Sequence, residues 1–467
     1  MITACLILTL LVSTISFACI TPLDIRRLNY FTFIFYLQFC VMTLVGVYLI
    51  NNGWSKDPIV CLVSEDNKRE ASFLVLYAVS FFSLALAFFC TLFKRNRRFF
   101  TNYLNKPLEP TSKSSNKYFF TLFIIVLILD AYFFRHLGGI PIIEAMRGGL
   151  NGFETSINRS EWVFNISPVL QLIRLTTTPL SQIIYFYFLV EWFTKKSSFE
   201  RILKVFITFM LAISMLLYGG DKAPIVFFLL GHFMLMVLLG KRISFFVASI
   251  FILGSVALIT AIYFLLMLVK GSDTLAALIN RIFVSQISGT YLAYQHFGSV
   301  EDFIGFSSQN ASLIRLFNGV PSLRVSERLI EYYFTGAYDL GLWKNTNSLF
   351  IHEAWGNFGI LGALISPIWC AFLIALYFFI LTGIGKNSFA IAFLTYASYA
   401  TISLSSSFNS YIFSVQFVFL FMVFLFGIIF CKYRFRIFPS RKSLYCTSVQ
   451  ADEARSTVSK PYFSPNG

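Results

Sequence analysis

The sequence is divided by long apolar runs, and these constrain the fold more than any other feature. Roughly eleven runs of about 20 mainly apolar residues occur, which is the length that a helix needs to cross a bilayer core. In lipid, backbone N–H and C=O groups must pair within the protein, so such segments form α-helices. We predict an all-α, polytopic membrane bundle of about 11 (10–12) transmembrane helices. The predicted spans are 1–20, 30–50, 72–93, 118–137, 175–193, 202–218, 223–240, 243–269, 357–383, 388–404 and 411–431.

Composition and cysteine spacing exclude several other classes of protein. Only 13% of the residues are charged, too few to cover a soluble surface. The net charge of +15 is typical of nucleic-acid-binding proteins, but no helix-turn-helix, zinc-finger, RRM or K-homology pattern occurs, so we predict no nucleic-acid partner. Most cysteines lie in apolar runs without CxxC or Cys/His spacing, so we predict no disulfide framework, no metal and no cofactor. No basic segment precedes the first apolar run, so Met1 to Ile20 is predicted to be the first span.

Basic residues mark alternate connections between the predicted spans. One set of connections is rich in Lys and Arg, beginning with Arg26 and Arg27, whereas the other set mixes acidic and basic residues. Since basic connections stay on the cytoplasmic side, we predict a periplasmic N-terminus and a cytoplasmic C-terminus. Residues 1–431 form the predicted bundle. The polar tail 432–467 is predicted to be a disordered cytoplasmic segment.

Two of the predicted outer connections are long. Loop 136–165 contains paired glycines, and loop 270–355 is too long to lack structure of its own. Within the larger loop, Thr274 to Tyr294 has an amphipathic pattern. Val325 to Phe334 is predicted to form a second short helix with Ser326 as its N-cap. We expect these helices to lie on the membrane surface or over a cavity between spans.

Basic residues retained on the predicted outer side point to an anion site. Charged groups near apolar segments are costly, and guanidinium groups bind phosphate in bidentate fashion, so several of them are predicted to converge on a phosphate or pyrophosphate. The alternative for each residue is an ion pair with a nearby acid, such as Arg135 with Asp130 or Lys222 with Asp221, or contact with lipid headgroups.

The strongest local signal is the polar stretch 345–357 that leads into the ninth predicted span. Gly356, Gly359 and Ala363 are predicted to share one helical face and to allow close packing. His352 and Glu353 would then lie at the outer mouth of the bundle, where a His beside a carboxylate is suited to act as a general base. The alternative is a capped helix start with a water-facing His.

The late outer loop, the His-Glu element and the Phe-Gly-x-x-Gly span that follows resemble the Wzy-type O-antigen polymerases, as does the Gly219-Gly220-Asp221-Lys222 hairpin. The resemblance implies a bacterial inner-membrane glycosyltransferase of the GT-C-like kind. Such enzymes transfer a growing glycan from undecaprenyl pyrophosphate to a new lipid-linked repeat unit on the periplasmic side. The expected partners are the lipid-linked donor and acceptor, the bilayer and a chain-length regulator protein.

The resemblance carries over to Lys222, His352 and Glu353, and the outer arginines complete the site that we hypothesise. His352 or Glu353 would deprotonate the acceptor hydroxyl, and four basic residues would bind the pyrophosphate. The four are Lys222, Arg281, Arg315 and Arg324. Two alternative functions remain open: an O-antigen ligase of the same architecture, and a polysaccharide flippase or transporter.

Overall fold

The computed structural model shows an all-helical molecule throughout the residues it describes. These are 1–27, 29–54, 56–137, 166–195, 198–218, 222–241, 243–244, 246, 254, 276, 279–308, 323–340, 343, 345–346, 348–400 and 408–433. Six helical segments are long and apolar enough to cross a membrane, so the chain is a multi-pass membrane protein. They are Ile2–Ile20, Tyr30–Asn51, Glu65–Leu92, Lys113–His136, Phe350–Gly383 and Phe408–Cys431.

The helices coincide with ten of the eleven predicted ranges, and the range 243–269 lies almost wholly outside the described residues. The second span combines α2 (Tyr30–Phe33), the π-helix η2 (Ile34–Leu44) and α3 (Val45–Asn51). The total of about eleven spans stays a prediction. The other elements of the bundle are α1 (Ile2–Ile20), α4 (Glu65–Leu92), α5 (Arg97–Asn105), α6 (Lys113–His136), α9 (Pro168–Thr194), α10 (Phe199–Leu217), α11 (Lys222–Leu238), α18 (Phe350–Gly383), α19 (Ser388–Ala400), α20 (Phe408–Ile412) and α21 (Val415–Cys431).

Polar caps set the starts of several of these helices. The hydroxyl of Ser64 accepts a hydrogen bond from the backbone N–H of Asn67 at the start of α4, where two acidic residues follow in the first turn. The serines before α6, α9 and α21 make the equivalent bond. A capping oxygen pairs a backbone donor that the helix leaves free, and acidic residues favour the positive end of the helix dipole. The apolar runs alone do not specify these boundaries.

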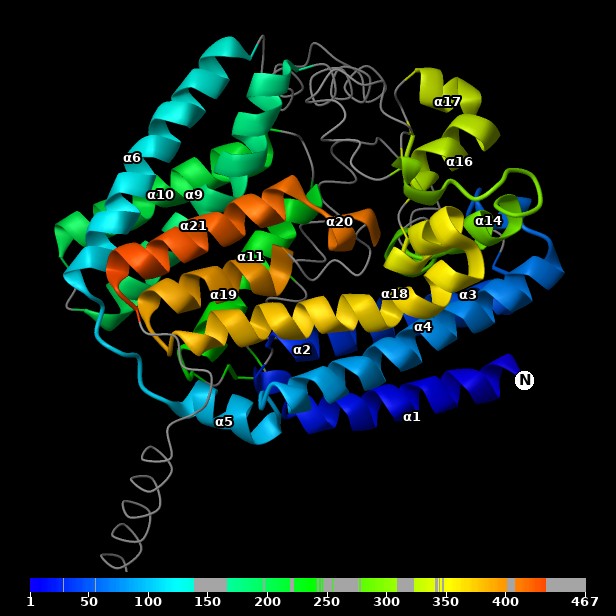
Figure 1. Cartoon of the computed structure of the whole chain (residues 1–467), viewed down its shortest axis with the longest axis horizontal. Coiled ribbons are helices and arrows are strands. Elements are labelled where there is room, and N and C mark those ends of the chain that lie inside the picture. Colours follow the sequence, from blue (N-terminus) through cyan, green and yellow to red (C-terminus); the bar gives the residue numbers. More distant parts are fainter. Residues whose placement is uncertain are drawn as a thin grey trace, which may run out of the picture.

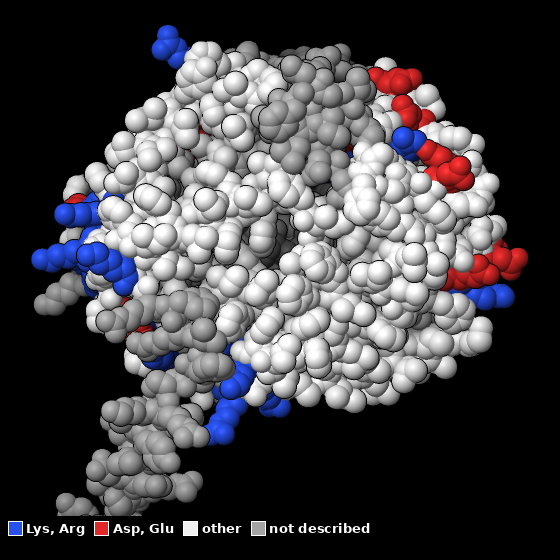
Figure 2. Space-filling model, in the orientation of Figure 1, with Lys and Arg blue, Asp and Glu red and all other residues white. Residues whose placement is uncertain are grey.

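The elements lie between two ends that differ in charge. Figure 2 shows Lys and Arg gathered at the left and lower edges, acidic residues with some basic ones at the upper right and right, and a mainly uncharged band between them. We call these the basic end and the mixed-charge end. Helices α1, α4 and α18 run between the two ends (Figure 1). This separation matches the two sets of connections predicted from the sequence.

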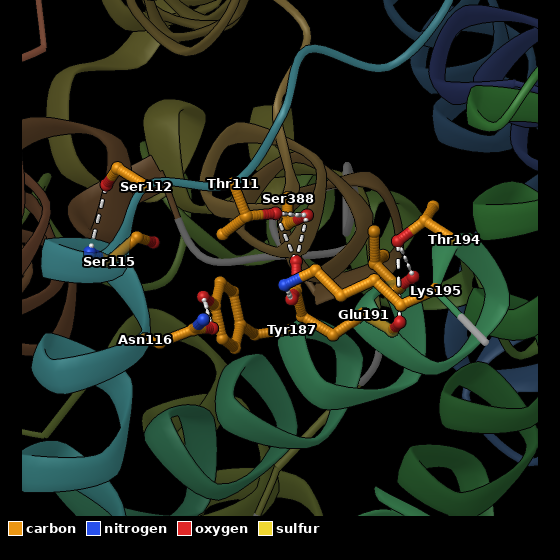
Figure 3. Close-up of polar contacts among 10 residues, drawn as sticks. Thr111, Ser112, Ser115, Asn116, Tyr187, Glu191, Thr194, Lys195 and Ser388 are labelled. Atoms are coloured by element: carbon orange, nitrogen blue, oxygen red, sulfur yellow. Dashed lines mark hydrogen bonds and ion pairs between the residues drawn. The ribbon is translucent and has the colours of Figure 1, made fainter. Parts of the chain in front are cut away.

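At the basic end, connections that are distant in sequence are joined by buried polar contacts. The carboxylate of Glu191 accepts hydrogen bonds from Thr111, from Ser388 at 2.7 Å, and from Lys195 in an ion pair (Figure 3). The buried Lys386 donates from Nζ to the carbonyl oxygen of Leu104 at 2.7 Å. Three basic connections are therefore held together around α5, α9 and α19.

Two cations of this end are buried in apolar surroundings. The guanidinium of Arg95 donates to Thr382 Oγ1 at 2.9 Å and lies over the rings of Phe99 and Phe379. Burial lowers the pKa of Arg95 to about 10. Burial, followed by repulsion from a neighbouring lysine, lowers the pKa of Lys386 to about 8. Cation–π contacts and hydrogen bonds offset part of the cost of removing these charges from water.

At the mixed-charge end, the described part of the predicted outer loop is folded against the starts of α4 and α18. It contains η4 (Asn280–Val284), α14 (Ser288–His296), η5 (Gly305–Ser308), α16 (Val325–Tyr333) and α17 (Thr335–Asp339). The predicted helix at Val325 to Phe334 is confirmed within one residue, but the predicted N-cap is wrong. Arg324 occupies the N-cap position of α16, and its backbone N–H donates to the Glu327 carboxylate at 3.1 Å.

The amphipathic pattern predicted at 274–294 is interrupted in the structure. A π-helical turn over 280–284 and a turn over 285–287 precede α14, and most of 274–278 lies outside the described residues. Asn280 donates from Nδ2 to Asp57 at 3.0 Å and accepts from the indole of Trp54 at 3.1 Å. These bonds tie the π-helical turn to the connection before α4, which explains why one straight helix does not form.

Residues at the two ends should be accessible from opposite sides of a membrane. Cys61 is exposed at the mixed-charge end, and Arg98 is exposed on α5 at the basic end. Two proteins are compared in intact cells: the wild type, which has Cys61, and a Cys61→Ser protein that also carries Arg98→Cys. A membrane-impermeant maleimide is expected to label only one of these two positions. The Cys61→Ser protein alone is the control, and labelling of both sites before permeabilisation would contradict the two-ended arrangement.

Candidate functional site

The helix that carries the predicted His-Glu element is broken at Gly359. This residue has φ 59° and ψ −140°, so α18 consists of two helices joined at this glycine. A residue with a side chain is strongly disfavoured at these angles. The prediction that Gly356, Gly359 and Ala363 share one continuous face is therefore wrong. Gly356 does allow close packing, because a Cβ there would lie 2.6 Å from a methyl of Val325.

The segment before η5 fills the break in α18. The backbone N–H of Ile304 donates to the carbonyl oxygen of Gly356 at 3.0 Å, which pairs a carbonyl near the end of the first half-helix. The ring of Phe303 lies where a Cβ on Gly359 would be, at 2.8 Å, and packs edge-on against Trp355. Backbone that is not in a regular helix must be covered by protein where it lies within the membrane, because lipid cannot pair its N–H and C=O groups.

A buried polar cluster links the break to α20. Glu353 accepts two hydrogen bonds from Asn409, one from its backbone N–H at 2.8 Å and one from Nδ2 at 3.0 Å. Asn357 donates to Asn409 Oδ1 at 2.8 Å, and Ser308 donates to Asn357 Oδ1 at 2.6 Å. All four side chains are buried, and Glu353 is fully buried. Three segments of the chain, α18, η5 and α20, thus meet through polar groups that pair with one another.

His352 lies one residue before this cluster and has a defined hydrogen-bonding state. The ring is buried, with 5% of the residue exposed, which rules out the water-facing alternative. Nδ1 is 3.1 Å from the carbonyl oxygen of Leu349, so Nδ1 must carry the proton in this contact. Nε2 is buried without a hydrogen bond to any described residue. In the neutral ring, Nε2 therefore holds a lone pair that can accept a proton.

The four predicted pyrophosphate-binding residues are placed differently. Arg324 is half-buried directly before Val325, which packs on Gly356, so its backbone lies close to the broken part of α18. The exposed Arg281 lies on η4, which packs against α3 and η2, and no described contact brings it to His352. Lys222 begins α11, but its side chain lies outside the described residues, and Arg315 lies outside them altogether.

The sequence analysis did not predict that Asn409 is a site residue or that Asp130 is buried. Asn409 lies in the polar run at 403–410 between two apolar spans, a signal that was available in the sequence. Asp130 is 2% exposed on α6, and neither carboxylate oxygen has a hydrogen bond to a described residue. The ion pair considered for Asp130 with Arg135 is absent from the described contacts. Within the same ranges, no three His, Cys, Asp or Glu side chains are grouped so that they could hold a metal ion.

Comparison with known proteins does not identify a family for this chain. No family model, curated protein or solved structure matches the chain.

Removing the carboxylate of Glu353 should destabilise the protein. Glu353→Ala leaves the buried backbone N–H of Asn409 without its acceptor, at a cost of about 1 to 3 kcal/mol, whereas Asn409 Nδ2 keeps its contacts with Ser308. Thermal unfolding in detergent should show a clearly lower midpoint. Glu331→Ala is the matched control, because Glu331 is exposed on α16, and an equal effect of the two substitutions would contradict the role of the buried cluster.

A side chain at Gly359 should be poorly tolerated. Gly359→Ala forces a strained backbone and places a Cβ against the Phe303 ring, so we expect a loss of roughly 1 to 3 kcal/mol in unfolding free energy. The same measurement on Gly336→Ala provides the control, since a Cβ on Gly336 in α17 meets nothing within 4 Å. If Gly359→Ala unfolds like the wild type, the break in α18 is not a fixed feature.

Proposed function

We propose that this chain is a glycosyltransferase of the O-antigen polymerase type in a bacterial inner membrane. The basic end faces the cytoplasm with the C-terminus, and the mixed-charge end faces the periplasm with the N-terminus. The positive-inside bias supports this orientation, because exposed Lys and Arg gather at one end in Figure 2 and the buried Arg95 and Lys386 lie at the same end. The bundle then has about eleven spans, and the helices of the late loop cover its periplasmic end.

The observation that carries the proposal is the state of His352. A neutral imidazole with Nδ1–H held by a backbone carbonyl presents Nε2 as the proton acceptor. His352 lies in the first half-helix of α18, seven residues before the break at Gly359, and membrane proteins use discontinuous helices to build binding sites. The surface is also hollowed near the middle of the face in Figure 2, beside α20. A buried base at a broken helix supports a reaction on a hydroxyl group.

In the proposed reaction, the hydroxyl oxygen of the acceptor repeat unit attacks the anomeric carbon of the donor glycan. The bond between that carbon and the pyrophosphate oxygen breaks, and the hydroxyl proton passes to His352 Nε2. Lys222, Arg281, Arg315 and Arg324 are the proposed cations for the departing pyrophosphate, with Arg324 the one whose backbone lies near α18. The acceptor reaches Nε2 only after the covering segments shift, because the atom is buried in this structure.

Glu353 has a different role in this proposal. Both of its oxygens accept hydrogen bonds from Asn409, so it positions α20 and the break in α18. We therefore assign proton transfer to His352 and orientation of the site to Glu353.

Cells that lack the gene should display single repeat units in place of long surface polysaccharide. Complementation with His352→Ala should restore long chains at least about a hundredfold less well than the wild type, because the general base is lost. The readout is the polysaccharide ladder on a gel, at membrane levels matched by immunoblot. His136→Ala is the control, since His136 is exposed at the end of α6.

A normal ladder in the deletion strain would overturn the polymerase proposal, and a fully active His352→Ala variant would remove His352 from the mechanism. Accumulation of finished lipid-linked polymer, in place of single units, would identify a ligase. Extension of undecaprenyl-pyrophosphate-linked repeats by the purified protein would separate an enzyme from a transporter.

A further inference from the structure

A groove runs between α1 and the second span at the mixed-charge end, away from the His352 site. Its outer part is a cavity of about 440 Å³, and a second cavity of about 270 Å³ adjoins it. Leu6 and Tyr48 line both cavities, so the two form one continuous groove. Figure 1 shows the N-terminal end of α1 and the adjoining end of α3 at the same edge of the molecule.

The two walls are helical faces with matching patterns. On α1, the lining residues follow helical spacing from Thr3 through Leu6 and Ile7 to Leu10. Residues at this spacing lie on one face of a helix. The facing wall presents Val45, Tyr48 and Asn52 at intervals of three and four residues. The remaining lining residues of that wall include Cys40, Leu44 and Asn51.

The opposite side of this second wall is closed. A Cβ on Gly46 would lie 2.5 Å from the carbonyl oxygen of Phe283, so η4 packs tightly behind α3. On the groove side, the side chains of Val45 and Tyr48 are 36% and 50% exposed. The wall therefore has one face committed to protein and one face open. The second wall also includes the π-helix η2, a form that occurs frequently at functional sites.

The chemistry of the groove changes along its length. The outer cavity is lined by the polar residues Thr3, Asn51, Asn52 and Arg69 together with Met1, Ile2, Leu6 and Tyr48. The inner cavity is lined by aliphatic side chains, Cys40 and the Tyr48 ring, and has no charged residue. Seven residues of α1 separate Thr3 from Leu10, so the apolar part extends about 10 Å below the polar part. The apolar part of the groove would not contribute to binding a free anion. A lipid has a polar headgroup and an apolar tail, so it matches both parts of the groove.

Arg69 supplies the charge at the polar mouth. It lies in the first turns of α4, it is exposed, and its guanidinium has no hydrogen bond or ion pair to a described residue. A guanidinium binds phosphate oxygens in bidentate fashion, and the hydroxyl groups of Tyr48 and Thr3 are further donors at the same mouth. The charge and the donors complement an anionic phosphate headgroup.

We propose that this groove holds one phosphate-bearing membrane lipid of the leaflet at the mixed-charge end. Arg69 contacts the headgroup phosphate, and the first part of one tail lies between α1 and the second span. The site does not depend on the proposed polymerase activity, because it is defined by lining residues outside the His352 site.

The test uses the full-length protein purified in a mild detergent and native mass spectrometry with dioleoyl phosphatidylglycerol. The wild type should retain one lipid molecule, and dioleoylglycerol, which has the same tails without phosphate, should be retained far less. Arg69→Gln should weaken phosphatidylglycerol retention about tenfold, because one charge-assisted contact is lost. Lys56→Gln is the matched control, since Lys56 is exposed at the same end but does not line the groove.

A second variant tests the tail. Val45→Trp should fill the apolar part and abolish retention, whereas Ile128→Trp on the exposed face of α6 should leave it unchanged. Size-exclusion chromatography and thermal unfolding show whether each variant is folded. If Val45→Trp is not folded, the test of the proposal rests on Arg69→Gln.

Three results would overturn the proposal: equal retention by Arg69→Gln and wild type, equal retention of dioleoylglycerol and phosphatidylglycerol, or displacement of the lipid by millimolar inorganic phosphate. The last would show a site for a free anion. No glycan is present in this experiment, so its outcome is separate from the fate of the polymerase proposal.

Discussion

The arrangement of this chain depends on the need to give every backbone N–H and C=O group a hydrogen-bond partner where water is absent. Most of the chain meets the requirement with continuous helices, because each N–H then bonds within its own segment. Gly359 breaks α18, and groups near the break must find partners elsewhere. Ile304 supplies one from the late loop, and Phe303 covers the gap. The folding of that loop and the shape of the candidate site follow from this single break.

Buried polar groups join separate segments of the chain at both ends of the molecule. At the basic end, Glu191 and Lys386 join connections that lie far apart in sequence, and their contacts hold the helix ends in one arrangement. At the mixed-charge end, Glu353 does this for α18 and α20. His352 differs, since one ring nitrogen is paired and the other is not. An unpaired buried acceptor costs free energy, and functional sites retain such costs.

The two proposals use separate parts of the mixed-charge end. The His352 site lies where the broken α18 meets α20, whereas the Arg69 groove lies between α1 and the second span. The Arg69 groove has polar residues at its outer part and apolar residues further in, whereas His352 and its neighbouring polar cluster are buried. No residue belongs to both sites, so the two proposals can be tested independently.

The sequence by itself determined the helical class, the places of most helices and the division of charge between two ends. These follow from local rules, because an apolar run of about 20 residues and the position of Lys and Arg do not depend on distant contacts. It also singled out His352, but it assigned Glu353 the same role. Only the tertiary structure decided that Asn409, some fifty residues further on, occupies both oxygens of that carboxylate. The glycines next to them were predicted to be packing residues, and Gly359 instead breaks the helix because the late loop fills the gap. Long-range partners of this kind leave no periodic signal in the chain, so the site had to be read from the fold.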